Sequence, residues 1–154
     1  MWMELIAIIV TLVLTAFFVE GGLGVGHVLT MLLDAPAIVT ILMLSLPVLL
    51  WNGMWKDFVR GFRLLKKGYT CSLAEMKRTQ DVVELMQKQI ICAGIILISF
   101  MLIVVLGFLQ KPEALGSNVA VILLTAFYVA IFEMLLLPVQ LEVKRRIIDY
   151  MEAE

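Results

Sequence analysis

The sequence predicts an all-α membrane protein with four transmembrane helices, of which the second and third extend into a short cytoplasmic helical hairpin. Three observations support this fold class: the hydrophobic content, long runs without charge, and the one-sided distribution of Lys and Arg. Hydrophobic residues make up 62% of the 154 residues and charged residues only 16%, whereas soluble domains carry about 25% charged residues. Much of the apolar surface therefore needs lipid as its solvent.

Three uncharged runs are each long enough to cross a bilayer. They comprise 21 residues from 35 to 55, 22 from 89 to 110 and 19 from 114 to 132. A helix rises about 1.5 Å per residue, so a hydrocarbon core of about 30 Å needs roughly 20 apolar residues. We therefore expect spans at about 35–55, 89–110 and 117–138, within a single membrane domain that covers residues 1–154.

A further span is expected at about 2–20, at the start of the chain. Its uncharged centre, Leu5–Val19, is 15 residues long and is bracketed by Glu4 and Glu20. A cleaved signal peptide is the competing interpretation, but signal peptides begin with basic residues and end at a small-residue cleavage site. Neither feature is present here, so the sequence favours a retained span.

The basic residues predict the orientation of the chain. Eight Lys and Arg lie between residues 56 and 88 and three between 144 and 146, whereas only Lys111 lies elsewhere. Basic residues flank spans on the cytoplasmic side. We therefore expect both termini, the hairpin at 56–88 and a tail at 141–154 to be cytoplasmic.

The expected hairpin carries recognisable helix signals. Phe58 and Phe62 recur at helical spacing after Trp55, and Ser72 with Glu75 forms a capping box that starts the second helix. This helix should continue unbroken into the third span. The charged residues here either contact another protein in the cytoplasm or form a solvated face; the contact candidates are Arg60, Arg63, Lys77, Arg78 and Glu84.

Few polar side chains fall inside the expected spans, where an acidic group is a functional candidate by default. Glu133 is the clearest case, and both an ion path and a structural role at the interface remain open for it. The Thr125 and Ser99 hydroxyls either line an ion path or bond back to a carbonyl one turn earlier. Ala126 and Ala130 form a small-xxx-small pair that permits close helix packing.

Several other classes of function find no support in the sequence. The net charge is −1 and there is no basic tail, so nucleic acid is not an expected partner. We find no nucleophile–base set, no paired carboxylates with a base and no phosphate loop, so we expect neither an enzyme nor a cofactor. One His cannot complete a metal site with Cys71 and Cys92, which we expect to be reduced thiols.

The segment Pro112–Tyr128, followed by Pro138 as the close of the helix, resembles the last span of MotA-type flagellar stator proteins. The stretches 20–22, 34–39 and 56–58 are similar to that family's first two spans and the basic helix after them. Four spans favour the MotA branch over the three-span TolQ and ExbB branch of the superfamily. The resemblance covers about two thirds of the chain.

The resemblance implies a ring-forming subunit of an ion-motive-force-driven motor in the bacterial inner membrane. Five copies would surround a pair of single-span, MotB/ExbD-like partner helices that carry the ion-binding Asp. The transported ion would be a proton or sodium, with no cofactor. Thr125 falls on one of the family's two adjacent threonines, which makes it an ion-path candidate together with Ser99 and Glu133. The candidates for ring or partner packing are Tyr128, Ala126, Ala130 and Pro138.

The chain also departs from the family pattern. Ala126 stands beside Thr125 in place of a second threonine, Glu133 stands where the family often has Asn, and Ser99 is the only hydroxyl near the usual third-span motif. The inner loop is also far shorter than in flagellar stators. These differences motivate an alternative function, that of a non-conducting membrane scaffold that keeps the ring fold and anchors or assembles a larger envelope complex.

Overall fold

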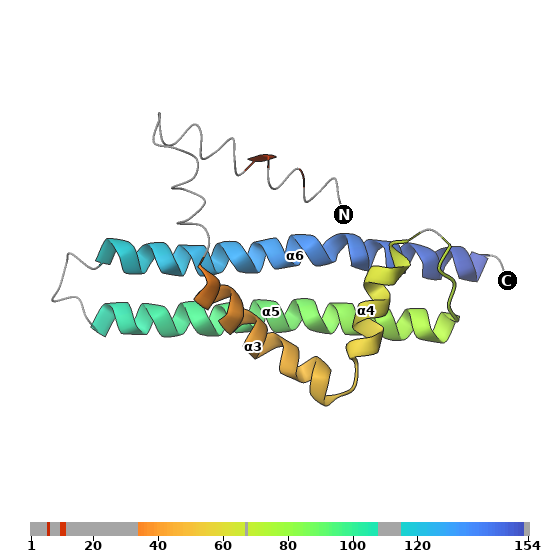
Figure 1. Cartoon of the computed structure of the whole chain (residues 1–154), viewed down its shortest axis with the longest axis horizontal. Coiled ribbons are helices and arrows are strands. Elements are labelled where there is room, and N and C mark those ends of the chain that lie inside the picture. The colour runs from red at the N-terminus through yellow and green to blue at the C-terminus, as the bar shows by residue number, and fades with distance from the viewer. Residues whose placement is uncertain (1–5, 7–9, 12–33, 67, 108–114, 153–154) are drawn as a thin grey trace.

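The computed structural model describes residues 6, 10–11, 34–66, 68–107 and 115–152. All regular secondary structure in these residues is helical (Figure 1), so the predicted all-α class is confirmed. The expected first span at 2–20 lies outside the described residues, apart from residues 6, 10 and 11, which are helical. The helices with known bounds are α3 (Ala35–Trp51), α4 (Trp55–Leu64), α5 (Leu73–Gly107) and α6 (Leu115–Glu152).

Two long antiparallel helices, α5 and α6, form the body of the described structure (Figure 1). They contain 35 and 38 residues, which correspond to about 52 and 57 Å of helix. Both are long and apolar enough to cross a membrane. Helix α5 contains residues 89–107 of the expected span at 89–110, whose last three residues lie outside the described part, and α6 contains the expected span at 117–138. Because a hydrocarbon core is about 30 Å thick, each helix is too long to lie wholly within it.

Helix α6 does not end at Pro138, and the expectation that this residue closes the helix is wrong. The helix continues to Glu152, so residues 141–152 of the predicted tail are its last part rather than a separate segment. Proline removes one backbone donor from a helix interior. Here Val139 and Val143 in the following turn are fully buried, and their packing keeps the chain helical beyond the proline.

The second expected span does not continue as one straight helix into the predicted hairpin at 56–88. Helix α3 ends at Trp51 and α4 begins at Trp55, with an angle of 106° between their axes. Gly53 adopts a left-handed conformation, with φ at +65°. Its N–H donates to the Leu50 carbonyl at 3.2 Å, and the Met54 N–H donates to the Leu49 carbonyl at 2.9 Å. These bonds form a Schellman motif, which ends α3. Counting α3 and α4 as one bent span would bring the membrane-crossing segments to three.

Gly53→Ala should weaken this bend. An alanine Cβ is disfavoured at φ of +65°, so we expect the free energy of unfolding to fall by about 1 kcal/mol. Thermal unfolding in detergent measures the change. Gly116→Ala is the matched control, because Gly116 lies in a helix with open space around it and no left-handed φ. Equal stability of both variants would show that the bend does not depend on the glycine.

Two buried clusters hold the helices together. The larger joins α3, α5 and α6 and the smaller joins α4 to the opposite ends of α5 and α6. The larger cluster contains Ala37, Ile41, Leu49, Val82, Met86, Ile90, Tyr128 and Leu136, and the smaller contains Leu64, Met76, Val143 and Ile147. Helix α4 approaches its neighbours closely at Gly61, where a Cβ would lie 3.0 Å from Val139 Cγ1.

The predicted capping box at the start of α5 is confirmed. The Glu75 N–H donates to Ser72 Oγ at 3.3 Å, and the Ser72 N–H donates to Glu75 Oε2 at 3.1 Å. The backbone N–H and hydroxyl of Ser72, followed by the Arg60 charge, lower the pKa of Glu75. These bonds satisfy donors that the first helical turn leaves unpaired, so α5 begins where the sequence indicates.

Candidate functional site

Thr125 lies on the face of α6 that packs against α5. Its side chain is 0% exposed, its hydroxyl donates to the Val121 carbonyl at 3.0 Å, and it lies 3.8 Å from Met101 Sδ. The hydroxyl is therefore bonded back to the helix one turn earlier, which is one of the two alternatives that the sequence leaves open. An ion path through Thr125 would run between two helices of the same chain.

Ser99 occupies a different environment from Thr125. It is exposed on α5, whereas Thr125 is enclosed between α5 and α6. No hydrogen bond between the two is present in the described part of the chain. A single copy therefore does not gather its two candidate hydroxyls into one polar cluster.

Tyr128 connects α6 to the start of α3. Its ring is 6% exposed, and its hydroxyl accepts a hydrogen bond from the Asp34 backbone N–H at 2.8 Å. Asp34 is the N-cap residue of α3, and its side chain forms no capping bond. The phenol therefore satisfies a backbone donor just before the helix. Tyr128 packs within its own chain, and its expected role in ring or partner packing stays a prediction.

Ala126 and Ala130 lie on a face of α6 that is open in a single chain. Both are exposed, and the register of the helix places Glu133 and Leu137 on the same face. Pro138 is half-buried. We call the set Ala126, Ala130, Glu133 and Leu137 the open face of α6. Its two alanines leave room for a second helix to approach closely.

Glu133 is the acidic group within the apolar part of α6. The residue is half-buried, and its Oε1 is covered by protein but has no hydrogen-bond partner among the described residues. Leaving a buried acceptor unpaired costs about 1–3 kcal/mol, and more for a charged group. The structure therefore places an acidic side chain with unused hydrogen-bonding capacity beside the open face.

Glu84, a cytoplasmic contact candidate, joins α5 to α6. Its Oε1 accepts from Gln80 at 3.2 Å and from Gln140 at 3.3 Å, and it lies 3.4 Å from Lys144 Nζ. The two amides, followed by Lys144, lower the pKa of Glu84, and these effects outweigh its desolvation. This carboxylate is thus already engaged within the chain.

The lowered pKa of Glu84 predicts a pH dependence of stability. Because the unfolded chain binds this proton more readily than the folded one, the contribution is present above the ordinary glutamate pKa and is lost as pH falls through the folded value. Glu84→Gln should therefore flatten the fall in stability between about pH 5 and 3. Thermal unfolding across that range measures it, with Glu152→Gln at the exposed end of α6 as the control. Identical slopes for wild type and Glu84→Gln would contradict the prediction.

Arg60 is also largely engaged within the chain. It pairs with Asp57 and lies 3.4 Å from Glu75. Burial opposes its charge, but the two carboxylates outweigh burial and raise its pKa. Arg63, Lys77 and Arg78 are exposed and form no ion pair among the described residues. Of the five contact candidates, these three keep their charges available.

Arg146 is a structural residue that the sequence analysis did not single out. Its guanidinium donates to the Tyr69 carbonyl at 2.7 Å, to the Lys66 carbonyl at 3.2 Å and to Glu142 at 2.9 Å. It therefore fastens the α4–α5 connection to α6. The only sequence signal is a basic residue that shares a helix face with Val143 and Ile147, and this signal does not identify the carbonyl partners.

Comparison of the chain with protein-family models, with curated proteins and with solved structures finds no match. In the described residues, no group of three or more His, Cys, Asp or Glu side chains could hold a metal ion. The geometry of α5 and α6, and above all of Glu133, is thus the basis for a functional interpretation.

Proposed function

We propose that this chain is the ring-forming subunit of an ion-motive-force-driven motor of the MotA/TolQ/ExbB type. It would work with a single-span partner that carries the ion-binding Asp. In this proposal residues 2–20, α3, α5 and α6 supply four spans, and both termini and the α4–α5 region lie in the bacterial cytoplasm. Five copies would form the ring around a pair of partner helices, and a proton or sodium ion would be transported.

The observation that carries the proposal is the position of Glu133. Glu133 is half-buried, has one covered and unpaired oxygen, and shares a helix face with exposed Ala126 and Ala130. A carboxyl group on a face bordered by lipid is costly, and intramembrane acidic residues normally face a protein interior or a water-filled path. A second protein helix against this face would cover the part of Glu133 that its own chain leaves exposed. A ring of copies around a partner provides such a helix.

The low burial of α5 and α6 within the chain also supports a ring subunit. Only 22% of the most apolar stretch of each helix is buried within the chain, so most of these side chains remain for lipid or for other protein helices. The cytoplasmic ends of both helices pack against α4 in the smaller cluster. Such a subunit has wide lateral surfaces in the membrane and a compact cytoplasmic end.

A scaffold without ion conduction is the second candidate, and Thr125 favours it. In the MotA-type family that the sequence resembles, the corresponding hydroxyl lines the ion path. In this chain the Thr125 hydroxyl is fully buried and bonded to its own helix. A selective ion path needs oxygens oriented toward the ion. A chain that keeps the ring contacts and turns this hydroxyl inward would assemble without conducting.

Affinity purification followed by a flux assay separates the two functions. The motor function predicts that a single-span protein with an Asp near the start of its span copurifies with the chain. Liposomes holding both proteins should then pass protons or sodium ions down an imposed gradient. Copurification without flux of either ion would favour the scaffold, and the absence of any such partner would contradict the motor.

A further inference from the structure

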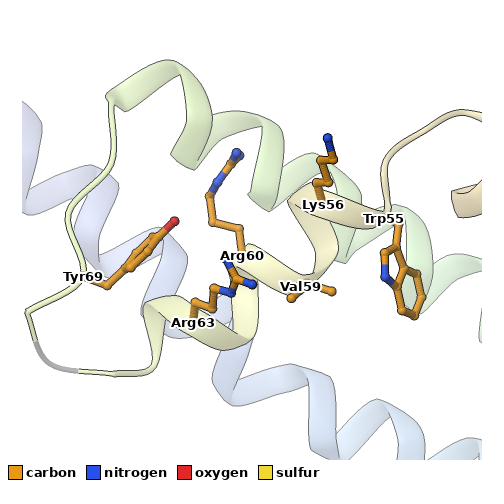
Figure 2. Close-up of a pocket in the computed structure, with 6 residues that line it drawn as sticks. All are labelled: Trp55, Lys56, Val59, Arg60, Arg63 and Tyr69. Carbon is orange, nitrogen blue, oxygen red and sulfur yellow. The ribbon is translucent and has the colours of Figure 1, made fainter.

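A basic pocket lies along α4 (Figure 2). It has a volume of about 380 Å³ and is lined by Trp55, Lys56, Val59, Arg60, Arg63 and Tyr69. Pockets of about 300–1,000 Å³ are typical of small-ligand sites. Figure 2 shows the three basic side chains projecting from α4 between Trp55 at one end and Tyr69 of the α4–α5 connection at the other. The pocket therefore combines three cations with an aromatic residue at each end.

The charges in this pocket are only partly neutralised. Arg60 is paired with Asp57 and Glu75, whereas Lys56 and Arg63 are exposed and form no ion pair within the described ranges. No acidic residue lines the pocket. Two available cations, Lys56 and Arg63, match an anion with several oxygens, and phosphate is the common anion of this kind.

An apolar groove lies on the side of α4 that carries Phe58 and Phe62, next to the side that lines the basic pocket. It has a volume of about 370 Å³ and is lined only by carbon-rich side chains: Leu42, Leu46, Phe58, Phe62, Met86, Ile90, Phe132, Leu135 and Leu136. The Trp55 and Phe58 rings are 6.0 Å apart, and the Phe58 and Phe62 rings 5.3 Å apart. This row of rings connects the basic pocket to the groove. One helix thus has a basic side and an apolar side.

We propose that α4 binds an anionic phospholipid, with the headgroup phosphate in the pocket of Lys56, Arg60 and Arg63 and one acyl chain in the adjoining groove. The 106° turn directs α4 away from the axis of α3, so a short helix with basic and aromatic sides follows an apolar helix of 17 residues. Such helices lie at the membrane surface and are attracted by anionic lipids. A soluble phosphate would use the pocket but leave the groove empty. The proposal needs only a membrane protein and does not depend on the motor function.

Native mass spectrometry of the full chain in detergent tests the proposal, with phosphatidylglycerol and phosphatidylcholine offered at equal concentration. Wild type should retain the anionic lipid in preference. Each basic residue near an anionic lipid contributes about fivefold to binding, so Lys56→Gln with Arg63→Gln should reduce this preference by at least about tenfold. The matched control, Lys77→Gln with Arg78→Gln, removes the same charge from an exposed pair on α5 and should keep the preference.

A second arm distinguishes the lipid from a soluble phosphate. Glycerol phosphate at millimolar concentration should not displace the retained phosphatidylglycerol, because it lacks the acyl chain that fills the groove. Efficient displacement would overturn the assignment in favour of a soluble phosphate site. The proposal would also fail if the Lys56/Arg63 variant kept the wild-type preference, or if the Lys77/Arg78 control lost it equally.

Discussion

Glu133→Gln should abolish ion flux through liposomes that contain the chain and its copurifying partner. The substitution keeps the size of the side chain but removes a carboxyl group that, in the proposed ion path, takes up and releases a proton. Removing a positioned proton-transfer group typically lowers a rate by about 10²-fold or more, so flux should fall close to that of empty liposomes. Dye-detected acidification under an imposed potential measures it.

The control for this experiment is Glu152→Gln, the same chemical change at the exposed end of α6. It should leave flux unchanged. The amount of assembled complex, measured by size-exclusion chromatography, should be equal for both variants and wild type. Normal flux with Glu133→Gln would remove Glu133 from the ion path and leave it the structural role that the sequence also allows.

Gly94→Leu should separate α5 from α6. A Cβ at this position would lie 2.4 Å from Val129 Cγ2, and Val129 is a β-branched residue with little freedom to move. Overpacking of a close contact typically costs 1–3 kcal/mol, and a full leucine side chain requires a larger displacement than a methyl group. We expect the free energy of unfolding in detergent to fall by at least about 2 kcal/mol.

Gly107→Leu provides the matched control, because Gly107 ends the same helix and has open space around it. It should leave stability near the wild-type value. The combination of Gly94→Ala with Val129→Ala should recover part of the stability that Gly94→Ala alone removes. If Gly94→Leu were as stable as Gly107→Leu, the close approach of the two helices at Gly94 would be contradicted.

The parts of the fold that depend on local chemistry could be predicted from the sequence. Long uncharged runs locate the apolar parts of α5 and α6 because burial in lipid needs a minimum length of helix. The Ser72–Glu75 capping box identifies the start of α5 because both of its partners lie within four residues. Each of these signals requires no information about the neighbouring helices.

Features that depend on tertiary packing were missed or wrongly predicted. Pro138 normally favours a helix end, but burial of Val139 and Val143 against other helices outweighs its missing donor. Gly53 carries a sequence signal for a helix end, which the continuous apolar pattern around Trp51 and Trp55 obscures. The roles of Tyr128 and Arg146 depend on backbone groups 94 and 77 residues away, and no local pattern reveals such partners.

The candidate site was only partly predictable for the same reason. Glu133 stands out in the sequence because carboxylates are rare in spans, and the structure adds that one of its oxygens is unpaired. The pattern could not show that Thr125 faces into its own chain while Ser99 is exposed. That difference depends on the rotation of α5 and α6 about their axes, which packing determines.

Thiol labelling at position 78 tests the orientation on which the proposed motor function depends. Arg78 is exposed on α5, so Arg78→Cys in a Cys71→Ser, Cys92→Ala background presents one reactive thiol in the α4–α5 region. A membrane-impermeant maleimide should label this cysteine in inverted inner-membrane vesicles and leave it unmodified in right-side-out vesicles. Labelling from the outer side would place α4 on the wrong face of the membrane and contradict the proposed topology together with the motor built on it.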